Sequence, residues 1–376
     1  MRDHNISGAA CSGRALISGI TGQDGSYLAE HLLKHGYEVH GIRRPSSTYS
    51  TARLEHLREF SEDYTKGLVL HYGDLTDSSS LDKIISTVQP DEVYNLGALS
   101  HVHLSFAHPE LVANIDGLGT LRLLESLRRH NSGARFYQAS TSELFGNAAS
   151  FPINEQTPFS PRSPYAIAKL YSFFITKNYR EAYGLFAANG ILFNHESPRR
   201  GASFVTRKIA RGLVARLGGV SGPLTLGNLD AIRDWGHARD YVRAMHLMLS
   251  APVPKDYVIA TGHDYSVREF LVAALNVLGV EFERVGAGTA ERYVYSGNSS
   301  GSQGLMAEAR IKLARGEDIV RVSSRYFRPT EVNRLVGDAS IARAELGWYP
   351  EVSFSDLVLE MMLSETESLN RFPLPY

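Results

Sequence analysis

Short apolar runs alternate with helical segments from residue 14 onward, and this alternation constrains the fold more than any other feature. Residues 14–20 are predicted to form a buried strand, and residues 26–36 place Leu28, Leu32 and Leu33 on one helical face. Further strands are predicted within 37–43, 66–75, 91–98, 134–141 and 185–193, with helices near 78–88, 109–130 and 164–183. Strands that alternate with helices in this way form parallel sheets covered on both faces. The sequence therefore predicts an α/β fold built on a doubly wound parallel sheet.

The alternation becomes irregular beyond about residue 195, where segments 223–228, 256–262 and 266–279 mix short strands with helices. We therefore expect a flexible leader over 1–13 and a nucleotide-binding domain over 14–195, to which later segments can return. Residues 196–376 are expected to form mainly a smaller α/β lobe that binds substrate and closes over the sheet edge. The Gly/Ser-rich segment 296–304 is typical of a mobile loop.

Charge and cysteine content exclude several classes of protein. The chain has 39 Lys+Arg against 40 Asp+Glu, so it offers no basic surface for nucleic acid or an anionic membrane. A single cysteine, Cys11, excludes an intramolecular disulfide framework and a Cys-rich zinc site. His101 and His103 form an HxH pair without an evident third ligand, and no bound metal is expected for this protein. With no long apolar run and a polar start, we expect a cytoplasmic location and no membrane partner.

Three glycines follow the first strand and open the first helix. Gly19 permits a tight turn, Gly22 lets the backbone approach a pyrophosphate, and Gly25 lets the helix pack closely on the strand. The spacing is GxxGxxG, and the strand–turn–helix context is the one that a dinucleotide-binding turn requires. An anion then lies at the positive end of the helix. These features favour a Rossmann-type domain over a simple turn.

The end of the second strand indicates which dinucleotide is bound. An NAD enzyme places Asp or Glu there, whereas this chain has Arg43, Arg44, Ser46 and Ser47. Guanidinium groups and hydroxyls suit a 2′-phosphate. We therefore expect the two arginines to bind NADP, and the alternative is that they are exposed to solvent without a ligand. Residues Asp74-Leu75 and 95–100 follow the third and fourth strands and are expected to contact the adenine and line the cofactor.

Tyr165 and Lys169 lie at positions i and i+4 of a predicted helix, one turn apart on the same face. A nearby ammonium group is expected to lower the pKa of the phenol, which then accepts a proton from an alcohol as a hydride leaves. Thr141 and Glu143 follow the fifth strand at the carboxyl edge of the sheet, where Thr141 can donate to the reacting oxygen. Glu143 is a candidate base for elimination next to a ketone; the alternative is a capping or ion-paired carboxylate.

Several ordered blocks then identify a resemblance that covers about residues 14–363. They are ALISGITGQDGSYLAEHLL, HYGDLTDSSSL, PDEVYNLGALSHV, FYQASTSELFG, PRSPYAIAKLY, NGILFNHESPRRG, FVTRKI, IRDWGHARDYV and RYFRPTEV. With these blocks the chain resembles the GDP-mannose 4,6-dehydratases, a family of extended short-chain dehydrogenases/reductases.

The resemblance implies an intramolecular redox cycle on GDP-D-mannose that yields GDP-4-dehydro-6-deoxy-D-mannose and water. Tightly held NADP takes a hydride from C4, with Tyr165 as base and Lys169 as its support. Glu143 removes the C5 proton, water leaves from C6, and the hydride returns to C6. The family also forms homodimers and homotetramers.

The resemblance also assigns residues to the cofactor and the substrate. The cofactor positions are Gly19, Ile20, Thr21, Gly22, Gln23, Asp24, Gly25, Arg43, Asp74, Leu75, Leu96, Gly97, Ala98, Leu99, Ser100, Tyr165, Lys169, His195 and Arg200. The GDP-sugar positions are Ser100, Asn194, Val205, Lys208, Arg233, Arg328 and Glu331, for which ordinary surface charge is the alternative. Leu111 departs from the family pattern, which has a cofactor-contacting tyrosine there, and residues 284–322 are expected to be a variable loop.

The sequence leaves three other functions to be weighed. A nucleotide-sugar epimerase or reductase keeps the glycine turn and the Tyr165–Lys169 pair but needs no base at Glu143. A dTDP-glucose-type dehydratase carries an acid next to the glutamate, where this chain has Ser142. A non-catalytic NADP-binding scaffold has no reason to keep Thr141, Glu143, Tyr165 and Lys169 together.

Overall fold

The computed structural model describes residues 12–46, 51–59, 67–298, 304–306, 311–327 and 330–371. Several predictions fall outside this part of the chain: most of the expected leader, Ser47, Arg328, and residues 299–303 of the Gly/Ser-rich segment. The largest described sheet is parallel throughout. Its strands, in spatial order, are β11 (Asp256–Ile259), β6 (Ala187–Leu192), β5 (Arg135–Thr141), β4 (Glu92–Asn95), β1 (Gly13–Ser18), β2 (Tyr37–Arg43) and β3 (Leu68–Tyr72).

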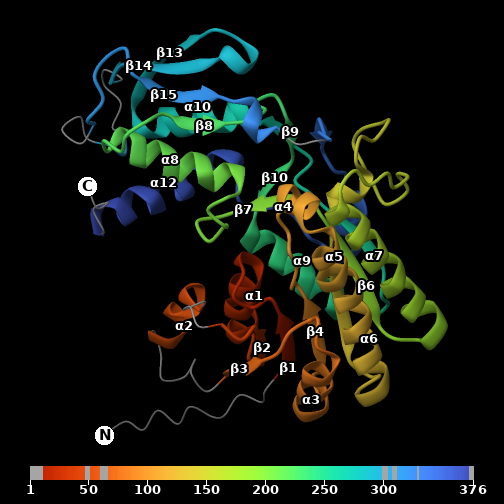
Figure 1. Ribbon diagram of the computed structural model, residues 1–376. Coiled ribbons are helices and arrows are strands. Elements are labelled where there is room, and N and C mark those ends of the chain that lie inside the picture. Colours follow the sequence, from red (N-terminus) through yellow and green to blue (C-terminus); the bar gives the residue numbers. More distant parts are fainter. Residues whose placement is uncertain are drawn as a thin grey trace, which may run out of the picture.

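Helices cover both faces of this sheet, which confirms the predicted Rossmann-type doubly wound fold (Figure 1). One face carries α1 (Gln23–Lys34), α9 (Ala238–Ser250) and α11 (Ser340–Leu346). The other carries α3 (Ser78–Val88), α6 (Gly119–His130) and α7 (Pro164–Tyr183). Leu28 and Leu32, one turn apart on α1, are fully buried in the core on the α1 face of the sheet. Leu81 and Leu124 are buried in the core on the opposite face. The predicted apolar faces are thus the faces that pack on the sheet.

The long helix expected over 109–130 is interrupted. Its two α-helical parts, α5 (Pro109–Val112) and α6, flank a π-helical stretch, η3 (Ala113–Leu118). The wider turn brings Gly119 against Leu75, where a Cβ atom at position 119 would lie 2.8 Å from the Leu75 Cβ. In the same stretch the Asp116 side chain turns inward and accepts the Leu99 N–H. π-helical turns of this kind often occur at functional sites.

A second lobe has its own core and a four-stranded sheet, with helices packed on it (Figure 1). Its sheet has the order β13 (Val280–Val285), β14 (Arg292–Asn298), β15 (Asp318–Val322) and β8 (Leu224–Leu226). The helices are α8 (Val205–Leu217), α10 (Val267–Leu278) and α12 (Phe354–Arg371). The expectation of a variable loop over 284–322 is therefore wrong for β14 and β15, because Tyr293 and Val320 pair across these strands in the lobe's core.

The remaining described elements are short, and several of them border the space between the two lobes. The strands are β7 (Asn194–Glu196) with β10 (Trp235–His237), and β12 (Tyr265–Ser266), β9 (Ile232–Arg233) and β16 (Arg334–Leu335). The helical turns are η1 (Ala52–Leu54), α2 (His56–Glu59), α4 (Val102–Ala107), η4 (Ser142–Phe145), η5 (Gly288–Ala290) and η7 (Ser324–Tyr326). Among the described helices, none combines the length and the apolar character that a bilayer span requires.

Candidate active site

A cleft of about 1120 Å³ lies at the carboxyl ends of β1, β2, β4 and β5 and extends to residues of the second lobe. Ligands of open α/β sheets bind at this edge. The structure brings nearly all predicted site residues together as lining of this cleft: Gly19, Thr21, Gly22, Gln23, Asp24, Gly25, Arg43, Asp74, Leu75, Leu96, Gly97, Ala98, Leu99, Ser100, Thr141, Glu143, Tyr165, Lys169, Asn194, His195, Arg200, Val205, Lys208, Arg233 and Glu331.

Five predicted residues are exceptions. Ser46 and Asn95 do not line the cleft, and Ser47 lies outside the described residues. Ile20 does not line the cleft; its side chain is fully buried in the core, where it packs beneath Gly41 of β2. Arg328 lies outside the described residues. Leu111, the departure from the family pattern, also does not line the cleft, and its side chain is exposed on α5.

The glycine turn has almost no room for side chains. Gly19 has φ +72°, and a Cβ atom there would lie 2.8 Å from the backbone of Gly97 on the neighbouring strand end. A Cβ atom at Gly25 would lie 2.5 Å from the Ile20 Cα. Gly22 is the N-cap of α1 and has no side chain to satisfy the first N–H groups of the helix. These N–H groups therefore remain available to an anion in the cleft.

Asp24 and His195 form a buried ion pair beside this turn. His195 Nε2 donates to the Asp24 carboxylate at 2.8 Å, and its Nδ1 donates to the Phe193 carbonyl oxygen at 2.8 Å. Because both partners are acceptors, both ring nitrogens carry protons and the ring is a cation. Burial opposes this charge, yet Asp24 outweighs burial and raises the pKa of His195. The same contact lowers the pKa of Asp24 against the effect of its own burial.

Arg43 lies at the end of β2 and faces the cleft together with Arg44. The Arg43 guanidinium stacks 4.2 Å from the centre of the Tyr72 ring and donates to the Tyr72 hydroxyl. Asp74, after β3, accepts hydrogen bonds of 2.8 Å from both the N–H and the hydroxyl of Thr76, which shapes the turn at the cleft edge. The Arg43 guanidinium is therefore held in a fixed orientation at the position where the 2′-phosphate of the adenosine is expected.

α7 positions the tyrosine and the lysine. The helix begins where the Ser163 hydroxyl accepts the Ala166 N–H at 3.1 Å, with Pro164 in the first turn. Tyr165 and Lys169 then lie one turn apart, 8% and 3% exposed. Lys169 Nζ donates to the Ala139 carbonyl oxygen of β5 at 3.0 Å. The ammonium group is thereby held at the end of the strand that leads to Thr141.

The expected lowering of the Tyr165 pKa is wrong for this structure. Burial raises the pKa of Tyr165, and the negative charges of Asp116 and Glu143 raise it further. A hydrogen bond with Thr141 and the charge of Arg200 act in the opposite direction. Lys169 Nζ lies 6.0 Å from the centre of the Tyr165 ring and is bonded to a carbonyl oxygen instead. Lys169 is not among the groups that shift the pKa of Tyr165 most.

Asp116 is a buried carboxylate at this face that sequence reasoning missed. One of its oxygens accepts the Leu99 N–H at 2.7 Å, and the other has no hydrogen-bond partner among the described residues. Burial raises the pKa of Asp116, while the charge of Lys169 opposes the increase. Burial in turn lowers the pKa of Lys169, opposed by Asp116 and Asp24. No motif marked Asp116, because its role depends on the π-helical turn that directs it inward.

Thr141 and Glu143 stand at the junction of β5 and η4. The Thr141 hydroxyl accepts the Glu143 N–H at 3.2 Å, which caps the short helical turn. Glu143 is 8% exposed and lines the cleft with Tyr165, whose phenol is close enough to sense its charge. The arrangement places a hydroxyl, a carboxylate and a phenol at one end of the cleft, which suits proton transfer to and from adjacent carbons.

The second lobe contributes cations and amide groups. α8 begins at Val205 without a side-chain cap, so its first N–H groups are open, and Lys208 follows one turn later. Lys208 Nζ lies 3.6 Å from the centre of the Tyr326 ring, and burial lowers the pKa of this lysine. The buried Asn194 Oδ1 has no hydrogen-bond partner among the described residues. Arg233 is 6% exposed and donates to the Ile232 carbonyl oxygen at 2.8 Å.

Sequence reasoning also did not single out several other cleft residues. Among them are Arg53, Asn228, Arg325 and Tyr326. Arg53 donates to the Thr21 carbonyl oxygen at 3.1 Å and to the Arg199 carbonyl oxygen at 2.7 Å, which holds it at the glycine turn. The one sequence signal for Arg53 is that it belongs to segment 43–53, which is rich in arginine.

Comparison with known proteins shows the family. The sequence model of the family described as GDP-mannose 4,6 dehydratase matches residues 16–361. The GDP-mannose 4,6-dehydratase of Vibrio cholerae serotype O1 is 55% identical over 355 residues, which cover 94% of this chain and 93% of that protein.

Solved structures agree on the fold. The dTDP-glucose 4,6-dehydratase DesIV from Streptomyces venezuelae, with NAD and TYD bound, superposes with a TM-score of 0.76 and 24% identity, over 96% of this chain and 99% of that one. RMD from Pseudomonas aeruginosa, complexed with NADPH, gives a TM-score of 0.70 and 20% identity, over 95% and 100%. The solved structures show the fold alone, whereas the family match and the 55% identity show the family. The chain belongs to the GDP-mannose 4,6-dehydratase family.

Proposed function

We propose that the protein converts GDP-D-mannose to GDP-4-dehydro-6-deoxy-D-mannose and water, as a lyase with tightly bound NADP. The observation that carries the proposal is the buried carboxylate of Glu143 in the same cleft as Thr141 and Tyr165. A simple alcohol dehydrogenase needs the tyrosine but has no use for a second base beside it. A dehydratase needs both, because it removes a proton from the carbon next to the newly formed ketone.

The glycine turn and the strand ends fit a nicotinamide dinucleotide. The open N–H groups of α1 and the space that a Cβ atom at Gly19 or Gly25 would fill suit a pyrophosphate. Neighbours of this fold carry NAD or NADPH. We infer NADP for this chain, because Arg43 and Arg44 face the cleft at the end of β2, where an acidic residue would repel a 2′-phosphate.

The chemistry divides between the cofactor and the side chains. A bound NADP would supply the hydride acceptor for C4 and the hydride donor for C6, and its oxidised ring would add a positive charge to the cleft. Tyr165 takes the C4 hydroxyl proton, and that added charge offsets the burial and the acidic neighbours that raise its pKa. Thr141 donates a hydrogen bond to the C4 oxygen, and Lys169 supports the phenolate with its charge.

Elimination is then the task of Glu143. Once C4 is a ketone, the proton on C5 is acidic, and the carboxylate removes it and passes it to the C6 hydroxyl, which leaves as water. The double bond between C5 and C6 is reduced at C6, and C5 regains a proton that balances the one Tyr165 took from the C4 hydroxyl. Cofactor and side chains end the cycle in their starting states, so the products are the keto-deoxy sugar nucleotide and one water.

The nucleotide part of the substrate is assigned to the second lobe. The open start of α8 at Val205, with Lys208 and Arg233 nearby, offers N–H groups and cations to a diphosphate. Asn194 and Glu331 offer an amide and a carboxylate to ribose or guanine. In this division residues 14–195 hold mainly the cofactor and residues 196–376 mainly the substrate.

An apolar face on the first lobe supports assembly into a homodimer or homotetramer. Large apolar side chains on α4, α5, η3 and α7, which pack against one another, are exposed in the single chain. They are Leu104, Leu111, Leu118, Ile167, Tyr171 and Phe174. Contiguous exposed apolar residues of this size mark protein–protein contacts more often than free surface.

The test of the proposed reaction is direct. Purified protein is incubated with GDP-D-mannose, and we expect a product lighter by one water in the mass spectrum. Glu143→Gln should retain bound NADP and lose the product, while Glu110→Gln, which alters an exposed glutamate on α5, should behave like wild type. Dehydration by Glu143→Gln at the wild-type rate would contradict the role of Glu143.

A further inference from the structure

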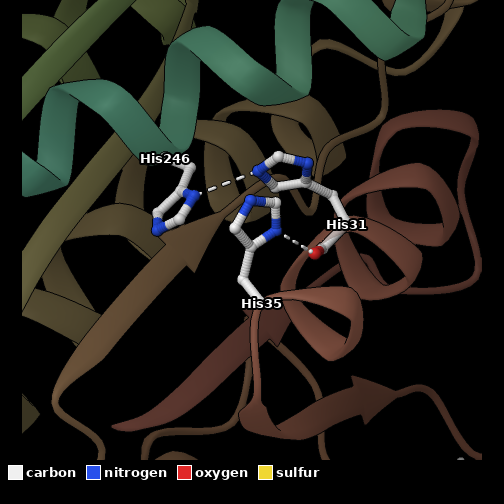
Figure 2. Close-up of side chains that lie close together, drawn as sticks. All are labelled: His31, His35 and His246. Carbon is white, nitrogen blue, oxygen red and sulfur yellow. Dashed lines mark hydrogen bonds between the residues drawn. The ribbon is translucent and has the colours of Figure 1, made fainter. Parts of the chain in front are cut away.

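Three histidines meet on the face of the first lobe that carries α1 and α9. His31 belongs to α1, His35 follows directly after its last turn, and His246 belongs to α9 (Figure 2). One nitrogen of each ring lies within 4.8 Å of the corresponding nitrogens of the other two. None of the three lines the active-site cleft. The cluster is therefore unrelated to the residues proposed above for cofactor or substrate.

The nitrogens are already spaced for a shared ion. His31 Nε2 and His246 Nδ1 are 3.0 Å apart. Two nitrogens bound to one tetrahedral Zn²⁺ at about 2.0–2.1 Å lie roughly 3.3 Å apart, so little movement separates this pair from a ligand pair. His35 Nδ1 donates to the His31 carbonyl oxygen at 2.8 Å, and Figure 2 shows its other nitrogen facing the gap between the two rings.

Groups behind the rings fix which nitrogen faces the gap. His246 Nε2 lies 3.4 Å from the Tyr37 hydroxyl, which itself donates to Glu92 at 3.2 Å. Nε2 of His246 is thus the donor and leaves its Nδ1 lone pair toward His31. The His35 ring is fixed in the same way by a backbone carbonyl. Metal-binding histidines almost always have such a partner on their second nitrogen.

The surroundings leave space and balance the charge. A cavity of about 360 Å³ adjoins the cluster and is lined also by Arg243, Tyr349 and Glu351. Arg243 is paired with Glu351 and lies 3.6 Å from the Asp240 carboxylate, so its charge is largely compensated.

We propose that His31, His35 and His246 bind one transition-metal ion of the Zn²⁺ class, with the fourth position open to the adjoining cavity. Three imidazoles on two elements form a ligand set suited to Zn²⁺, Cu²⁺ or Ni²⁺. The ion ties the C-terminal end of α1 to α9, at the opposite end of α1 from the glycine turn. His31 and His35 are one helical turn apart, but His246 is far along the chain, so no sequence motif reveals the set.

Equilibrium dialysis of the full-length, chelator-treated protein against Zn²⁺ tests the site. We expect one tightly bound zinc per chain and, with Co²⁺ in its place, the visible absorption of a tetrahedral complex. His35→Ala and His246→Ala should each weaken Zn²⁺ binding at least about 100-fold, whereas Tyr37→Phe, which removes a supporting hydrogen bond, should weaken it about tenfold. His130→Ala removes an exposed histidine outside the cluster and should change nothing.

Folding is checked separately from binding. His35 is exposed, so His35→Ala should keep the circular dichroism spectrum and the metal-free melting temperature of wild type. Zn²⁺ should raise the melting temperature of wild type and of His130→Ala but not of His35→Ala. The proposal is overturned if wild type binds Zn²⁺ no more tightly than the double variant His35→Ala/His246→Ala, or if His35→Ala keeps wild-type affinity.

Discussion

At the scale of single residues, the Tyr165 hydroxyl lies among charges of both signs. Asp116 and Glu143 disfavour its phenolate, and Thr141 and Arg200 favour it. Sequence spacing predicted the tyrosine, the lysine and the glutamate, because each follows a strand end or shares a helix face. It did not predict Asp116, and it did not predict that burial, Asp116 and Glu143 raise the pKa of Tyr165 despite the lysine one turn away. Which charges face a buried group depends on packing that one sequence does not encode locally.

Asp116→Asn tests this charge balance. The change removes a negative charge that disfavours the phenolate, so the pKa of Tyr165 falls. Because the proposed base must be ionised, the acid limb of the kcat/KM profile against pH should move down by about 0.5–1 unit. Glu110→Gln, an exposed carboxylate nearby, should leave the profile in place. An acid limb that stays or moves to higher pH in Asp116→Asn would show that Asp116 does not act on the base.

Arg43→Ala tests the choice of cofactor. A guanidinium on a 2′-phosphate makes charge-assisted hydrogen bonds worth about 1.5–3 kcal/mol, so NADP affinity should fall about 10- to 100-fold. Affinity for NAD, which lacks this phosphate, should stay within about twofold. Fluorescence titration with both reduced cofactors measures the two values, with Arg128→Ala as a surface control. Equal losses for NADP and NAD would mean that Arg43 does not read the 2′-phosphate.

At the scale of elements, α1 shows how far local pattern determines structure. Leu28 and Leu32 were predicted on its buried face, and the glycines at its start occupy positions where a Cβ atom would collide with backbone. The strands and helices up to β6 follow the predicted ranges within a few residues. The π-helical stretch η3 was not predicted, because its contacts with Leu75 and Leu99 join it to segments elsewhere in the chain.

Gly25→Ala should displace α1 from β1. The new Cβ atom would lie 2.5 Å from the Ile20 Cα. Because this is a backbone atom, the clash can be relieved only if the whole glycine turn moves. We expect a loss of about 2–4 kcal/mol in unfolding free energy and at least about tenfold weaker NADP binding. Gly133→Ala, where no atom approaches closer than 4.0 Å, is the matched control and should stay within about 0.5 kcal/mol. Wild-type denaturation and binding in Gly25→Ala would refute the close packing of the turn.

At the scale of the whole molecule, the sequence was informative for the first lobe and poor for the second. β11 returns from beyond residue 195 to extend the main sheet beside β6, and β14 and β15 form a sheet within the expected loop. Pairings of this kind join segments far apart in the chain, and a short strand such as β15 carries little periodic signal. The cleft between the lobes likewise depends on long-range packing. Many of its lining residues were nevertheless predicted, because they come directly after strands that the sequence predicted.

The apolar face of α4, α5, η3 and α7 should hold copies of the chain together. Phe174 is 51% exposed there, and a charge at this position would be buried unpaired in an assembled interface. Sedimentation velocity should find wild type as a dimer or tetramer and Phe174→Glu as a monomer. Leu359→Glu, which alters an apolar side chain 40% exposed on α12, should keep the wild-type assembly. A monomeric wild type at all concentrations would reject the interface.

The path of one hydrogen atom tests the central claim most directly. Protein loaded with NADP is given GDP-D-mannose carrying deuterium at C4, and the product is analysed by NMR and mass spectrometry. A hydride that is removed from C4 and returned after elimination must appear at C6 of a product one water lighter, with no net change in the cofactor. Deuterium that is released to free NADPH, or a product that keeps its water, would contradict the account.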